Sequence, residues 1–107
     1  MSEDSVMRKL AQLKAAEAKL RDQQAKYESD ASKKRKDAST KKRSAERTSS
    51  TSLRRSYTNS ALKLENDAAA LDKKAADVSK KLADNLGKQR QETRVPAKSL
   101  IMRSGSG

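Results

Sequence analysis

The sequence predicts an all-α protein, a long two-helix antiparallel coiled-coil hairpin with a flexible C-terminal tail. Apolar residues recur at steps of three and four for about forty positions on either side of residue 50, which is typical of helices with one apolar face. That spacing is interrupted at one interior place, a run of Ser and Thr at 48–52. The single Pro and all three Gly lie at or beyond Gly87, so the chain before that point contains no helix-breaking residue.

The first arm is expected to cover residues 3 to 47. It begins with Ser2, Glu3 and Asp4, a capping hydroxyl and two acids that suit the positive end of a helix dipole. The apolar ladder is filled by Val and Leu as far as Leu20, and by alternating Ala and Lys near its end. Alanine buries little area, so the far half of this arm needs a partner helix. The ladder positions are Val6, Leu10, Leu13, Glu17, Leu20, Gln24, Tyr27, Ala31, Lys34, Ala38, Lys41 and Ala45.

The run Thr48-Ser49-Ser50-Thr51-Ser52 is predicted to form the bend between the arms. Ser and Thr hydroxyls hydrogen-bond to nearby backbone groups and therefore favour caps and turns over helix interiors. Ser50, Thr51 or Ser52 would cap the second arm.

The second arm is expected at residues 53 to 90, where the steps from Tyr57 to Leu82 alternate between four and three without a miss. Leu alternates with Ala, which predicts a close antiparallel seam in which a large residue faces a small one. With a bend near residue 50, the numbers of facing residues should add up to roughly 100, which places Leu13 near Leu86 and Tyr27 near Leu71. The ladder positions are Leu53, Tyr57, Ala61, Leu64, Ala68, Leu71, Ala75, Val78, Leu82 and Leu86.

A helical domain of residues 1–92 and a tail of residues 93–107 are therefore expected. Gly87 is a candidate C-cap, although the helix formers at 88–91 could continue the helix for another turn. Val95-Pro96 disfavours helix, and the end of the chain is typical of a flexible linker or of residues added for expression.

Charge is concentrated around the predicted bend. The net charge is +12, and residues 33–55 hold ten Lys or Arg against Asp37 and Glu46, a net +8, whereas residues 1–32 hold six of each sign. Three interpretations remain open: a solvated helix surface, a site for polyanions such as nucleic acid or anionic lipid, or a nuclear-import-like signal. The candidate polyanion-binding residues are Lys33, Lys34, Arg35, Lys36, Lys41, Lys42, Arg43, Arg47, Arg54 and Arg55.

Composition argues against an enzyme. The chain contains no Cys and no His, and it has no glycine-rich phosphate loop or nucleophile–base pair. We therefore expect no catalytic residues, no cofactor and no metal site. No apolar run approaches the ~18 residues of a membrane span and no signal peptide is visible, so a cytoplasmic location is expected. The low hydrophobicity and high charge are also compatible with a chain that folds only on a partner.

The segment from Ser44 to Tyr57, together with the Ala/Lys/Leu arm after it, carries a family resemblance. It resembles the N-terminal coiled-coil region that precedes toll/interleukin-1-receptor-like (TIR) domains in some bacterial, especially actinobacterial, proteins. The likeness covers about residues 6–90. In that family the following domain can bind or cleave NAD and signals when clustered. The resemblance implies that this chain is an assembly or sensing segment without catalytic residues of its own.

The sequence therefore predicts a non-catalytic coiled-coil module for oligomerisation or partner binding, with polyanion binding through the basic bend as the alternative. The partner is expected to be a second copy or another helical protein; non-specific nucleic acid is possible, and a membrane is not expected because the bend lacks an apolar face. The residues predicted for the helix seam and for assembly are Leu10, Leu13, Leu20, Tyr27, Tyr57, Leu64, Leu71, Val78, Leu82 and Leu86.

Overall fold

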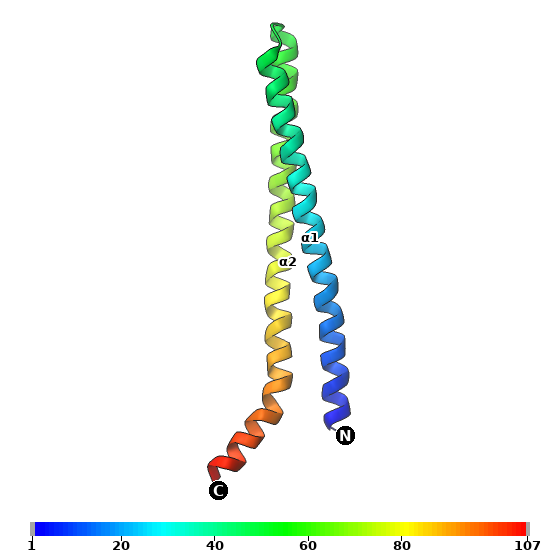
Figure 1. Cartoon of the computed structure of the whole chain (residues 1–107), viewed down its shortest axis with the longest axis vertical. Helices are drawn as coiled ribbons and strands as arrows, with labels where there is room; N and C mark the ends of the chain where they lie inside the picture. Colours follow the sequence, from blue (N-terminus) through cyan, green and yellow to red (C-terminus); the bar gives the residue numbers. More distant parts are fainter. Residues whose placement is uncertain (1, 107) are drawn as a thin grey trace. The chain divides into compact units, whose positions relative to one another are not determined.

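The computed structural model describes residues 2–106, with the side chains of residues 3–93. Two helices, α1 (Ser2–Arg47) and α2 (Thr51–Ser106), are joined by the three residues 48–50 (Figure 1). The predicted two-helix antiparallel hairpin is confirmed. The end of the chain at Gly107 lies outside the described residues, as do the side chains of the expected tail after Thr93.

The bend is held by hydrogen bonds among its own residues. The Leu53 amide donates to the Ser50 hydroxyl at 3.3 Å, and the Ser50 amide donates to the Thr48 hydroxyl at 3.2 Å. Ser50 is therefore the N-cap of α2, the first of the three candidates. At the end of α1 the Arg54 guanidinium donates to the Thr48 carbonyl at 3.0 Å, so it satisfies a carbonyl that the helix itself leaves free.

The chain divides into two compact units, which we call the bend unit (residues 23–77) and the terminal unit (residues 1–22 and 78–107). The core of the bend unit consists of alanines at the ladder positions of both helices, each with 7% or less of its surface exposed. Small side chains allow the two helix backbones to approach closely, so this seam is closed within one chain. The alanines are Ala31, Ala38, Ala45, Ala61, Ala68 and Ala75.

The terminal unit has a different core, built from larger side chains. Val78 and Leu82 of α2 are buried, with 5% and 7% exposed, and the next ladder position is the polar Asn85, at 7%. The Val and Leu residues that α1 contributes to this core stay half-buried: Val6, Leu10, Leu13 and Leu20.

The end of the second arm differs from the prediction. Helix α2 continues to Ser106 rather than ending near residue 90, and Gly87 lies inside it without a positive φ, so Gly87 is not a C-cap. The residues Lys88-Gln89-Arg90-Gln91 are strong helix formers that carry the helix onward. Pro96 removes one backbone hydrogen bond from the helix but does not end it.

Leu53 was predicted to begin the apolar ladder of the second arm, and this prediction is wrong. Its side chain is 48% exposed. From Leu53 to Ala61 the ladder would need two successive steps of four, which drift off a stripe that alternates three and four. The position that keeps the alternation is Arg54, whose guanidinium binds the end of α1 instead.

Candidate interaction surfaces

None of the predicted seam residues is exposed, but most are incompletely covered. Val78 and Leu82 are buried, whereas the other eight are half-buried. In the bend unit, cations from the opposite helix cover the two tyrosines. The Lys74 ammonium lies 5.9 Å from the Tyr27 ring centre and the Lys41 ammonium lies 5.7 Å from that of Tyr57. The eight half-buried residues are Leu10, Leu13, Leu20, Tyr27, Tyr57, Leu64, Leu71 and Leu86.

Two hollows in the terminal unit have two leucines each in their walls. One, of about 310 Å³, is lined by Leu13, Ala16 and Leu20 of α1 together with Lys81, Asp84, Asn85 and Lys88 of α2. The second, of about 260 Å³, is lined by Leu10 and Leu86 among polar neighbours. We call the first of these the leucine groove. A surface of this kind, apolar in its floor and charged at its rim, suits the side chains of another helix.

A cluster of polar side chains crosses the seam of the terminal unit, and the apolar pattern of the sequence does not predict it. The Asn85 side-chain amide donates to the Leu13 carbonyl at 2.9 Å, and the Gln89 amide donates to the Asn85 side-chain oxygen at 2.6 Å and to the Glu17 carboxylate at 2.9 Å. Arg21 donates to the other Glu17 oxygen at 2.8 Å. The spacing of these residues could have indicated the cluster. After Leu82 the alternating steps of three and four continue through Asn85, Gln89 and Glu92, but a search for apolar residues does not detect polar side chains at these positions.

The cluster favours the charged form of Glu17. The hydrogen bond from Gln89, followed by that from Arg21, lowers the pKa of the Glu17 carboxyl from its ordinary value of 4.5. One turn further along α2, Glu92 lies 3.5 Å from the Lys9 ammonium of α1. The hydrogen bonds of Asn85 and Gln89 at seam positions select one register, because a slip would leave the buried Asn85 amide unpaired.

The structure separates the ten basic residues predicted around the bend into two groups. Three have partners: Arg35 pairs with Asp72, Lys42 pairs with Glu65, and Arg54 donates to the Thr48 carbonyl. Lys41 is half-buried over the Tyr57 ring. These four contribute to the contact between the helices of the bend unit and are less available to an external anion.

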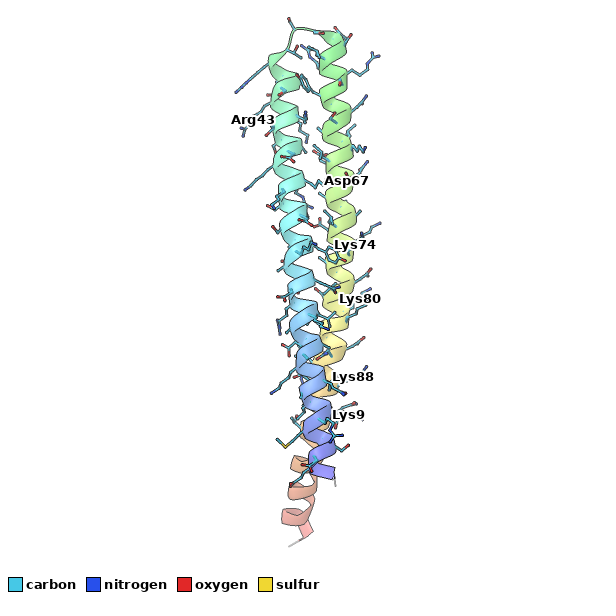
Figure 2. The ribbon with its side chains drawn as sticks, turned by 90° about the vertical axis from the view of Figure 1, so that its right-hand side faces the viewer. Lys9, Arg43, Asp67, Lys74, Lys80 and Lys88 are labelled. Atoms are coloured by element: carbon cyan, nitrogen blue, oxygen red, sulfur yellow. The ribbon has the colours of Figure 1, made fainter. Side chains whose placement is uncertain are left out.

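The remaining basic residues make no ion pair and no hydrogen bond within residues 3–93, where side chains are described. All except Lys34, which is half-buried, are exposed. Figure 2 shows one of them, Arg43, extending from α1 on the side away from α2. The residues in this second group are Lys33, Lys34, Lys36, Arg43, Arg47 and Arg55.

Neither a metal site nor a membrane span is found among the described residues. No group of three or more His, Cys, Asp or Glu side chains there is placed to hold a metal ion. Neither helix, over the same residues, combines the length and the apolar character needed to span a bilayer. A hollow of about 450 Å³ beside the bend is lined by side chains of both charges, among them Lys42, Glu46 and Arg54.

Comparisons with known proteins were made over the whole chain. No protein-family model matches it, and no significant match is found among curated proteins or solved structures.

Proposed function

We propose that this chain is a non-catalytic coiled-coil module that assembles with a second copy of itself through the leucine groove of the terminal unit. The observation that carries the proposal is the contrast in burial between small and large residues. The six seam alanines of the bend unit are covered to 93% or more by the hairpin alone, whereas large seam residues of both units stay half-buried. Among these, Leu10, Leu13 and Leu20 of the terminal unit also line hollows of the surface. Burying apolar surface is worth about 25 cal/mol per Å², so association that covers the part of these leucines left open by the hairpin adds a favourable term that the two helices do not provide.

The choice of a second copy as the partner is supported by the distribution of charge. Over its described side chains, the terminal unit holds nine Lys or Arg and six Asp or Glu, so opposite charges are available on both copies. The rim of the leucine groove itself carries both signs, with Asp84 between Lys81 and Lys88. A groove with mixed charges can pair with its own copy in an antiparallel arrangement, as the two faces of an isologous interface must. Assembly of a segment ahead of another domain is also the role implied by the resemblance to coiled coils that precede TIR-like domains.

The proposal is tested by the double variant Leu13→Gln/Leu20→Gln. Glutamine keeps the helix propensity of leucine but removes the apolar floor of the groove. We expect the variant to have a lower molar mass in solution than the wild type, measured by light scattering. Its melting temperature should also lose the dependence on protein concentration that a dimer shows.

A matched control is the double variant Leu53→Gln/Leu62→Gln. These leucines are 48% and 52% exposed and belong to the bend unit, so the same chemical change is made outside the groove. The control should keep the molar mass of the wild type. Equal dissociation of both variants, or an unchanged mass for the groove variant, would show that the groove is not the interface.

A further inference from the structure

We infer that the outer face of α1 in the bend unit binds the phosphate backbone of double-stranded nucleic acid without reading its sequence. The binding surface is a row of four exposed cations, Lys33, Lys36, Arg43 and Arg47, which we call the outer stripe. Each lies two residues after a seam position of α1, and two residues turn about 200° around a helix. The row therefore runs along the face opposite α2.

The positions of the stripe carry no acid, and the neutral Thr40 occupies the position between Lys36 and Arg43. The two acids of this segment flank the stripe: Asp37 lies about 40° around the helix from Lys33, and Glu46 about 60° from Arg43. Neither forms an ion pair with a stripe residue among the described side chains. At ~1.5 Å per residue, the row extends about 21 Å along the helix from Lys33 to Arg47. Over the same length a duplex presents about twelve phosphate charges at ~1.7 Å each, so every cation of the row can find a partner.

The charges of the stripe are available because nothing within the described part of the chain neutralises them. Arg35 and Lys42, which belong to the same segment, are paired with Asp72 and Glu65 on α2. The stripe residues have no such pair among the described side chains. The helix that carries them is held by the alanine seam, so a ligand orders only the side chains.

The observations favour a duplex over the other polyanions. Single strands are commonly bound by stacking of bases on exposed aromatic rings, but both tyrosines are half-buried and each has a lysine over its ring. A membrane surface calls for an apolar face beside the charges, and the stripe positions between residues 33 and 47 carry Lys, Arg and Thr40. Contacts to phosphates alone bind without sequence preference.

The test compares two double variants that lose the same charge. Lys36→Gln/Arg43→Gln removes two stripe cations, whereas Arg35→Gln/Lys42→Gln removes two that are already paired. Binding of the full chain to a short fluorescent duplex of random sequence is followed by anisotropy between about 50 and 200 mM salt. We expect the stripe variant to reduce the slope of log K against log salt by about two, since each phosphate contact contributes ~0.9, and the paired-cation variant to leave it unchanged.

Three results would overturn the inference. One is an equal change of slope in both variants, which would mean that total charge and not the stripe decides binding. Another is absence of duplex binding at low salt, including the case in which the chain binds phosphatidylserine–phosphatidylcholine vesicles instead. A third is tighter binding of a single strand than of the duplex. Circular dichroism and molar mass should be the same for both variants, so that a loss of binding reports on the stripe and not on folding or assembly.

Discussion

At the residue scale, the Ser50 hydroxyl accepts a hydrogen bond from the Leu53 amide, and Ser50 is the N-cap residue directly before α2. The sequence limited the cap to three neighbouring hydroxyl residues, and the structure selects the first of them. Propensity could not make this choice, because Ser and Thr are both good caps. The bend also contains a contact that a propensity scale does not include, the hydrogen bond from Arg54 to the Thr48 carbonyl at the end of α1.

Ser50→Ala should therefore destabilise the hairpin. The substitution leaves the Leu53 amide without its acceptor, and loss of an N-cap typically costs about 1 kcal/mol of unfolding free energy. Urea denaturation followed by circular dichroism measures the change. Ser49→Ala is the control, because the exposed Ser49 side chain makes no hydrogen bond in the described part of the chain. Equal loss in both variants would argue against the cap.

Glu17 should make the stability of the terminal unit depend on pH. Because its folded-state pKa lies below 4.5, the unfolded chain takes up a proton first as the pH falls. The stabilisation is thus complete above the ordinary pKa and disappears as the pH falls through the lowered value. We expect Glu17→Gln to be less stable than the wild type at neutral pH, with the difference closing in acid.

The pH profile of the denaturation midpoint checks this expectation. Glu28→Gln serves as the control, since Glu28 is exposed and has no partner among the described side chains. A gap between Glu17→Gln and the wild type that stays constant down to the acid limit would contradict the assigned role of the cluster.

At the scale of the elements, both helices and the place of the bend could be predicted, because alternating steps of three and four are a strong and local signal. All twelve ladder positions of α1 are buried or half-buried. The course of α2 after Leu82 could not be predicted in the same way. Its seam passes to Asn85 and Gln89, whose burial depends on hydrogen bonds to α1 that a pattern of apolar residues does not contain.

The sequence could not predict which basic residues around the bend are paired and which are free. A count of charges treats Arg35 and Lys36 alike. The packing of α2 against α1 brings Asp72 to Arg35 and leaves Lys36 exposed without a partner among the described side chains. The register between helices therefore decides which cations remain for a ligand.

Helix α2 contains a glycine whose replacement should stabilise it. Gly87 lies inside the helix without a positive φ, and a Cβ built on it would meet nothing within 4 Å apart from its chain neighbours and the nearby backbone of its own helix. Gly87→Ala should raise the unfolding free energy by roughly 0.5–1 kcal/mol, because alanine loses less backbone entropy on folding. Chemical denaturation of the variant and the wild type tests this. A decrease in stability would mean that the bare glycine surface is needed for a contact with another molecule.

At the scale of the whole molecule, the two proposed activities fall on different units. The bend unit has a core of buried alanines and carries the exposed cations of α1, whereas in the terminal unit Leu13 and Leu20 line a hollow of the surface. Association through the leucine groove depends on apolar burial and should tolerate salt, while binding through the outer stripe should weaken steeply with it. The dependence of each activity on salt concentration therefore distinguishes self-association from nucleic-acid binding.

Self-association is decided by the molar mass of the full chain in solution, measured by light scattering at low and at high salt. We predict at least twice the 11.8 kDa of a single chain, retained at high salt because the interface is apolar. A helical protein with the mass of one chain at both salt concentrations would contradict assembly through the leucine groove, since the half-covered leucines would then need no partner.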